Sequence, residues 1–159
     1  MKVTMFNGSA RKNGNTHIML EWLAKSLAAE GVDSEIADMG GMKLRGCSAC
    51  NVCFSAKNRR CSVQDNMNEL ISKMDEADGI VLASPTYFAD VTAEMKALID
   101  RAGYVGIAND NMYRRKVGAS VVVARRGGAI HAFDTMNHFF QISQVYIVSS
   151  RPAGNASLH

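Results

Sequence analysis

Residues 79–83 read Gly-Ile-Val-Leu-Ala, a run without a single polar or charged side chain. A strand that is apolar along its whole length is buried on both faces, which is typical of a parallel sheet covered by helices. Residues 84–88, Ser-Pro-Thr-Tyr-Phe, follow this run directly and carry hydroxyl and aromatic groups. In open parallel sheets ligands lie at the carboxyl ends of the strands, so this is a place to look for function.

On both sides of this run, strands and helices alternate. Further strands are predicted at Lys2–Asn7, Ser34–Asp38, Val117–Ala124 and Val145–Ser149. Helices are predicted at Thr16–Glu30, at 65–76 with Asp65 as N-cap, after a capping Thr92, and at Ile130–Phe140. The first helix is expected to turn Ile18, Met19, Trp22, Leu23, Leu27 and Ala28 inward. This alternation predicts an α/β fold with a parallel sheet and helices on both faces.

Size and charge limit the possible functions. The chain has 159 residues, of which 47% are apolar and 21% charged, with a net charge of +3. Residues 1–159 are therefore expected to form one domain with a real core. No basic stripe with interleaved aromatic residues points to nucleic acid, and no apolar run reaches membrane-spanning length. We expect a cytoplasmic protein that binds neither nucleic acid nor membrane.

The loop after the first strand, residues 8–16, combines hydroxyl, amide and glycine residues and ends where a helix begins. Backbone N–H groups and the positive end of a helix dipole suit a phosphate there. Ser9, Asn15 and Thr16 can add hydrogen bonds, and Arg11 a charge-assisted one. The loop is neither a P-loop nor the dinucleotide-binding glycine pattern. An ordinary polar turn capped by Asn15 or Thr16 is the alternative.

Two motifs in order, G-S-x-R-x-x-G-N-T at 8–16 and S-P-T-Y-F at 84–88 followed by M-K-x-x-I-D-R at 95–101, resemble the flavodoxin-like NAD(P)H-dependent FMN reductases. The resemblance implies a doubly wound five-stranded sheet of order 2-1-3-4-5. It also implies an FMN site with the flavin, not a catalytic side chain, carrying the chemistry. The implied cofactor-binding residues are Ser9, Arg11, Asn13, Asn15, Thr16, Pro85, Thr86, Tyr87, Phe88, Arg125, Gly127 and Gly128. Core packing of Tyr87 and Phe88, and a solvated basic turn at Arg125, are the alternatives.

All four cysteines, Cys47, Cys50, Cys53 and Cys61, fall within 15 residues. Three of them at successive C-x2-C spacings resemble the runs that hold iron–sulfur clusters, with Cys61 as the fourth ligand. In a flavodoxin-like chain they also resemble the iron–sulfur flavoproteins, which carry a 4Fe–4S cluster beside FMN. Reduced thiols without metal are the second interpretation, and a zinc site or a redox-active disulfide the third.

Three functions fit these patterns. The first is an FMN oxidoreductase with a cysteine-bound cluster that receives electrons from NAD(P)H or a ferredoxin-type partner. The second is a clusterless NAD(P)H-dependent FMN or quinone-type reductase. The third is a non-enzymatic electron carrier or redox sensor. Flavodoxin-like domains normally end with a further helix, which the sequence does not show after the fifth strand. The apolar patch left open is expected to be covered either by a second subunit or by a continuation of the chain. The resemblance implies a homodimer or homotetramer.

Overall fold

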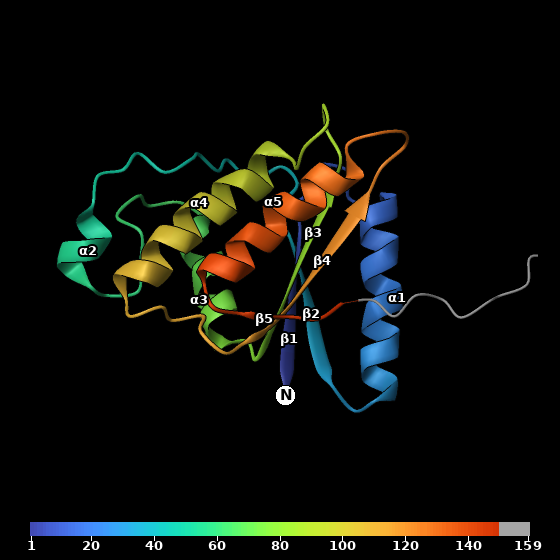
Figure 1. The fold of residues 1–159 in the computed structure, drawn as a ribbon, viewed down its shortest axis with the longest axis horizontal. Coiled ribbons are helices and arrows are strands. Elements are labelled where there is room, and N and C mark those ends of the chain that lie inside the picture. Colours follow the sequence, from blue (N-terminus) through green and yellow to red (C-terminus); the bar gives the residue numbers. More distant parts are fainter. Residues whose placement is uncertain (150–159) are drawn as a thin grey trace, which may run out of the picture.

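The computed structural model describes residues 1–149. Its five strands form one parallel sheet in the order β2-β1-β3-β4-β5 (Figure 1). This is the order that the resemblance implies, and the α/β fold predicted from the alternation of strands and helices is confirmed. The prediction about a missing final helix concerns residues 150–159, which lie outside the described part of the chain.

The strands are β1 (Lys2–Asn7), β2 (Asp33–Asp38), β3 (Gly79–Pro85), β4 (Val117–Val123) and β5 (Tyr146–Ile147). The helices are α1 (Asn15–Ala29), α2 (Val52–Ala56), α3 (Met67–Glu76), α4 (Ala93–Ala108) and α5 (Ala129–Ile142). Among the described residues, no helix is both long enough and apolar enough to cross a membrane.

Successive residues of a strand point to opposite faces, and β3 shows why both faces of this sheet are apolar. Val81 and Ala83 pack with Leu20 of α1 on one side. Ile80 and Leu82 belong to the larger core that α3, α4 and α5 complete on the other side. Figure 1 shows α1 alone on its side of the sheet, with α3, α4 and α5 opposite.

The predicted inward face of α1 is correct for Leu23 and Leu27 and wrong for Ile18, Met19, Trp22 and Ala28, which are exposed. Ile18, Met19 and Trp22 are 37%, 41% and 64% exposed. Leu20 is fully buried, and Leu23 and Leu27 are partly buried beside it. The apolar residues of this helix cover too wide an arc for one contact stripe, so the pattern alone does not say which of them meet the sheet.

Two other elements differ from expectation. The fifth strand is confined to Tyr146–Ile147 instead of Val145–Ser149, because its ladder with β4 has only two residue pairs. Helix α2, which the sequence analysis does not predict, lies inside the cysteine segment and far from the sheet (Figure 1). The predicted N-cap Thr92 is confirmed, since its hydroxyl accepts the Met95 N–H at 3.2 Å.

Parallel strands bring their carboxyl ends to one edge. The loops that follow β1, β3 and β4 therefore meet at the top of the view in Figure 1. The long connection from β2 to α3 leaves that edge and runs outward to α2 beside α4 (Figure 1). The fold thus places the two groups of candidate residues in two different regions.

Candidate functional site

A cavity of about 670 Å³ opens at the carboxyl ends of β1, β3 and β4, within the size range of small-molecule sites. We call it the carboxyl-edge cavity. Nine predicted residues line it: Ser9, Arg11, Asn13, Asn15, Thr16, Pro85, Thr86, Tyr87 and Arg125. Gly14, Val123 and Ala124 complete the lining. Of the predicted flavin residues, Phe88, Gly127 and Gly128 do not line it.

A hydrogen-bond network below the first loop fixes its shape. The buried Asn7 side chain donates to Asp38 Oδ1 (2.7 Å) and accepts the Ser9 N–H (3.1 Å). The Ser9 hydroxyl in turn accepts the Arg11 N–H (3.1 Å). Asp38 Oδ1 also lies 3.1 Å from His17 Nδ1. None of Asn7, His17 and Asp38 is among the residues that the motifs single out, yet they hold the loop against the ends of β1 and β2.

Helix α1 begins at the floor of this cavity. Its N-cap is Gly14, whose side chain cannot cap, and the Asn15 and Thr16 side chains make no cap hydrogen bond either. The first N–H groups of a helix have no partner inside the helix, and here they lie beside the cavity lining. The polar-turn alternative, in which Asn15 or Thr16 acts as an ordinary N-cap, is therefore wrong.

The loop after β3 turns sharply at residues 87–90. Tyr87 and Asp90 exchange backbone hydrogen bonds of 2.8 and 3.3 Å, and Phe88 and Ala89 both have positive φ angles (47° and 71°). The Phe88 ring is therefore carried fully into solvent, and Tyr87 is 42% exposed. Core packing, the alternative for these two rings, is wrong.

Thr86 is the unusual residue of this loop. Its N–H donates to Val123 O (2.8 Å), which ties the loop to β4. Its hydroxyl is buried and has no hydrogen-bond partner, although Thr86 lines the carboxyl-edge cavity. A buried hydroxyl without a partner costs free energy, so this atom marks a place where a polar ligand atom fits.

Gly128 supports the same loop from behind. It has a φ of +86°, and a Cβ built there would lie 2.6 Å from Ala89 Cα and 2.8 Å from Thr86 Cγ2. Only glycine combines this backbone conformation with so close an approach. Its contribution is thus to let α5 begin directly against the 86–89 backbone.

The four cysteines line a second, smaller cavity between α2, α4 and residues 61–63, which precede α3. We call it the cysteine cavity. All four are free thiols, with Cys47 and Cys50 exposed, Cys53 buried and Cys61 in between. The cavity volume is about 20 Å³, room for about one water molecule. As the sulfurs stand, no three His, Cys, Asp or Glu side chains within residues 1–149 are placed to hold one metal ion.

The thiols differ in their surroundings. The pKa of Cys50 lies below its usual value, chiefly because of the Ser62 hydroxyl 3.3 Å from its sulfur. Burial raises the pKa of Cys53, whose Sγ contacts Tyr104 O at 4.0 Å. Cys47 Sγ accepts the Ala49 N–H at 3.4 Å. The segment thus already supplies hydrogen bonds to sulfur, as a thiolate site requires.

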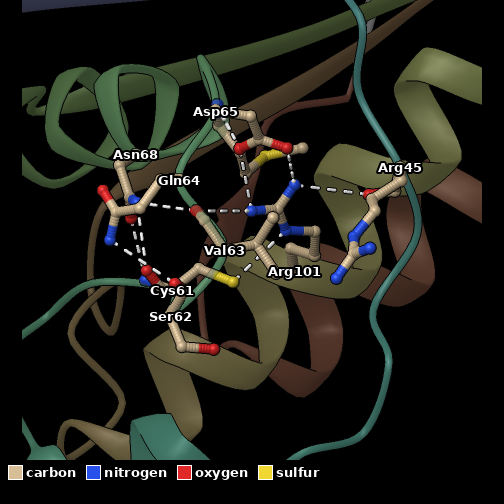
Figure 2. Close-up of polar contacts among 9 residues, drawn as sticks. Arg45, Cys61, Ser62, Val63, Gln64, Asp65, Asn68 and Arg101 are labelled. Atoms are coloured by element: carbon tan, nitrogen blue, oxygen red, sulfur yellow. Dashed lines mark hydrogen bonds and ion pairs between the residues drawn. The ribbon is translucent and has the colours of Figure 1, made fainter.

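Arg101 joins the cysteine cavity from α4, a placement that the sequence analysis does not predict. Figure 2 shows its guanidinium against Asp65, Cys61 and the carbonyls of Arg45 and Val63. Burial raises the pKa of Asp65, but hydrogen bonds from Arg101 and from Met67 N–H outweigh it, so that the pKa lies below its usual range. The N-cap of α3 is Asn66 and not the predicted Asp65, although Asp65 Oδ1 accepts the N–H of Met67, the first residue of the helix. The same carboxylate pairs with Arg101. An arginine on the inward-facing stripe of an apolar helix is the sequence signal for such a role.

The model of the NADPH-dependent FMN reductase family matches residues 1–156. The chain belongs to this family. An iron–sulfur flavoprotein of Methanocaldococcus jannaschii is 35% identical over 150 residues, which cover 93% of this chain and 76% of that protein. Another of Archaeoglobus fulgidus is 37% identical over 134 residues, 83% of this chain and 64% of its own length. The predicted family and its iron–sulfur flavoprotein branch are confirmed, and the chain is a flavin-dependent oxidoreductase.

Solved structures share the fold. A flavodoxin from the domain Archaea superposes with a TM-score of 0.61 at 16% identity, over 94% of this chain and 80% of that one. The flavoenzyme NAD(P)H:(acceptor) oxidoreductase of Paracoccus denitrificans gives a TM-score of 0.68 at 18% identity, over 96% and 77%. At such identities the likeness shows the flavodoxin-like fold alone.

Proposed function

We propose that the chain binds FMN in the carboxyl-edge cavity and an iron–sulfur cluster at Cys47, Cys50, Cys53 and Cys61, and passes electrons between them. NAD(P)H or a ferredoxin-type protein is the proposed electron donor. The observation that carries the proposal is that three loops, distant in sequence, bring nine predicted flavin residues to one cavity. The relatives named iron–sulfur flavoproteins support the proposal that the four cysteines bind a cluster.

The residues of the carboxyl-edge cavity fit FMN. The N-terminus of α1 suits the phosphate, since its unpartnered N–H groups lie at the positive end of a helix. The Ser9 hydroxyl, which donates to Arg11 O (3.3 Å) in this structure, would turn to the phosphate as a further donor. The unpartnered Thr86 hydroxyl lies among the lining residues of the same cavity and offers a further polar contact. Tyr87, half exposed at the rim, suits a flat ring.

The donor set of the cysteine cavity fits an iron–sulfur cluster, because four thiols from one short segment line one space. The cavity itself is too small as it stands, so binding requires the thiols to move apart. The segment that carries them runs outward from the sheet, and four of its non-glycine residues, Ala49, Asn51, Lys57 and Arg59, have positive φ angles. A loop of this kind can adjust more easily than a strand.

Bound FMN supplies hydride and single-electron chemistry, and a bound cluster supplies single-electron chemistry. The protein supplies position. Ser9 and the first turn of α1 fix the phosphate end, while the 86–89 turn, supported by Gly128, fixes the ring end. No side chain needs to act as a general acid or base in this scheme.

The decisive test is anaerobic purification followed by flavin and iron assays and an absorption spectrum of the same sample. One FMN and about four irons per chain are expected. FMN without iron, together with oxidation of NADH or NADPH, would favour the clusterless reductase. FMN without any such oxidation would favour a carrier or sensor. A protein that takes up no FMN would overturn the proposal. The homodimer or homotetramer and the cytoplasmic location remain predictions.

The phosphate assignment has a sharper test in Asn15→Asp. Asn15 is exposed in the first turn of α1, where a carboxylate favours the helix, so the variant should fold at least as well. The new charge should repel a phosphate and raise the Kd of FMN about tenfold. Riboflavin lacks the phosphate and serves as the matched ligand, with its Kd unchanged. Equal loss of both ligands would contradict the assignment.

A further inference from the structure

Arg101 is the largest fully buried side chain of the described residues, with 1% of its surface exposed. It lies on α4 among Leu98, Ala102 and Val105, where an apolar residue would be usual. Burying a guanidinium is costly unless its donors are paired. The role of Arg101 can therefore be inferred from the hydrogen bonds that it makes.

Its donors tie together the two ends of the cysteine segment (Figure 2). Nη1 donates to Asp65 Oδ2 (2.6 Å) and Arg45 O (3.3 Å), and Nη2 to Asp65 Oδ1 (2.9 Å) and Val63 O (3.3 Å). Arg45 precedes the first cysteine, and Val63 and Asp65 follow the last. The guanidinium is thus the point at which the segment closes on α4.

The remaining donor, Nε–H, points to Cys61 Sγ at 3.3 Å. The Asn68 side chain fixes the backbone of Cys61. Its amide oxygen accepts the Cys61 N–H (2.8 Å) and its amide nitrogen donates to Cys61 O (3.0 Å). Closing the segment needs only the bonds to Asp65 and the two carbonyls. The bond to sulfur is additional, and it acts on the one atom of Cys61 that can be a ligand.

We propose that Arg101 is a positioning residue that fixes Cys61 Sγ and, through this hydrogen bond, raises the reduction potential of a cluster held there. The inference rests on the proposed function. A cluster gains one negative charge on one-electron reduction, and an N–H directed at a ligand sulfur stabilises that charge. No proton is transferred at Cys61 and no bond breaks, so the electron is the only species added.

Asp65 should lower the reduction potential of the cluster, opposite to the effect of Arg101. Its carboxylate pairs with both terminal nitrogens of Arg101 and so offsets the positive charge beside the sulfur. Asp65→Asn keeps the hydrogen bond from Arg101 Nε to Cys61 Sγ and keeps an oxygen that accepts the Met67 N–H. It removes the negative charge that offsets the charge of Arg101. This variant should therefore raise the potential, whereas Arg101→Gln should lower it.

The experiment is a dye-mediated titration of the anaerobically purified holoprotein with dithionite, followed by the absorbance and electron paramagnetic resonance of the cluster. Arg101→Gln should make reduction about tenfold less favourable, a midpoint lower by about 59 mV. Arg101→Lys keeps the charge and should recover part of the shift. Lys96→Gln is the matched control, because Lys96 pairs with Asp100 on the exposed surface of the same helix and does not line the cysteine cavity, so its midpoint should stay unchanged.

Each outcome decides between distinct explanations. A purely structural Arg101 would lower the unfolding temperature and iron content of its variants but leave the midpoint of the remaining cluster unchanged, which would overturn the inference. If Arg101→Gln retains no iron, Asp65→Asn decides, since its midpoint should rise if the inference holds and match the unmodified protein if it fails. An unmodified protein without iron would instead overturn the proposed function, and this inference with it.

Discussion

The Thr86 hydroxyl is expected to lower the stability of the protein without ligand and to strengthen the binding of FMN. Without a ligand it is buried and unpaired, so Thr86→Val, of nearly equal shape, should stabilise the protein by about 1 kcal/mol. If this hydroxyl contacts FMN as proposed, the same change should raise the Kd of FMN about tenfold. Thermal unfolding and flavin fluorescence titration measure the two effects.

Thr86→Ser is the control, because it keeps the hydroxyl and loses only a methyl group. Its Kd for FMN should stay close to that of the unmodified protein. If Thr86→Val binds FMN as tightly as Thr86→Ser, the hydroxyl does not contact the cofactor.

Where a motif names individual residues, most but not all of them lie at the cavity, since Phe88 of the S-P-T-Y-F motif does not line it. Ser9, Asn15 and Thr16 are predicted from their hydrogen-bonding chemistry, and they line the cavity. Arg101 belongs to a quoted motif, but its contact with Cys61 joins positions 40 residues apart, which only the folded chain brings together. Local spacing carries no information about such pairs.

Among the elements, the start of α5 depends on Gly128. Gly128→Ala should lower the unfolding temperature and weaken FMN binding, since the new Cβ would lie 2.6 Å from Ala89 Cα in a left-handed conformation. A loss of about 2 kcal/mol in the free energy of unfolding is expected.

Gly127→Ala is a control one residue away. A Cβ at Gly127 meets nothing within 4 Å, so this change should leave unfolding temperature and Kd nearly unchanged. Similar losses in the two variants would show that loop flexibility, not the close approach, is what matters.

Strands β1 and β2 are joined to α3 by Glu35. Its carboxylate meets Lys2 (2.9 Å) and Lys73 (2.7 Å), whose hydrogen bonds lower its pKa from 4.5 to about 2. The unfolded chain then binds more protons than the folded one between these values, so this contribution to stability is complete above about pH 5, falls with pH, and disappears below about pH 2.

Glu35→Gln should therefore cost on the order of 1 kcal/mol at pH 7 and nothing near pH 2. Urea unfolding at several pH values measures the difference, and Glu30→Gln, at the exposed end of α1, serves as control. A loss that is constant with pH would mean that packing, and not charge, explains the effect of the substitution.

Elements with a regular period were predictable and irregular ones were not. Helix α2 is five residues long, and left-handed Asn51 and Lys57 stand at its two ends in place of glycine. Neither a period nor a stop signal is present in so short a segment. The prediction of which residues of α1 face inward was in error for a different reason, because its apolar residues allow more than one inward face.

At the scale of the whole molecule, the two cavities share no lining residue. Cys50→Ser, at an exposed thiol outside the core, should abolish iron binding while the Kd of FMN changes by less than about twofold. Iron assay and flavin titration on the same preparation test this. Loss of flavin together with iron would show that the two sites depend on each other.

The sheet order is predictable from the sequence, because alternation indicates a parallel sheet and the paired motifs at 8–16 and 84–101 indicate its family. The position of the cysteine segment is not. Its place beside α4 is set by contacts of Cys53, Phe54 and Cys61 with Tyr104 and Arg101, none of which follows a local pattern.

Helix α4 reaches both regions. Its capping Thr92 is bonded to Ser84 at the end of β3, whereas Arg101, Tyr104 and Val105 line the cysteine cavity. A helix of 16 residues is about 24 Å long and stiff. The number of residues in α4 therefore determines how far apart the two cavities lie. Point substitutions can change what either cavity binds, whereas changing the distance between them while keeping the same face of α4 toward the cysteines takes insertion or deletion of about a whole turn, about 5.4 Å. Protein engineers can therefore exchange the cysteine segment for another ligand set and keep the spacing unchanged.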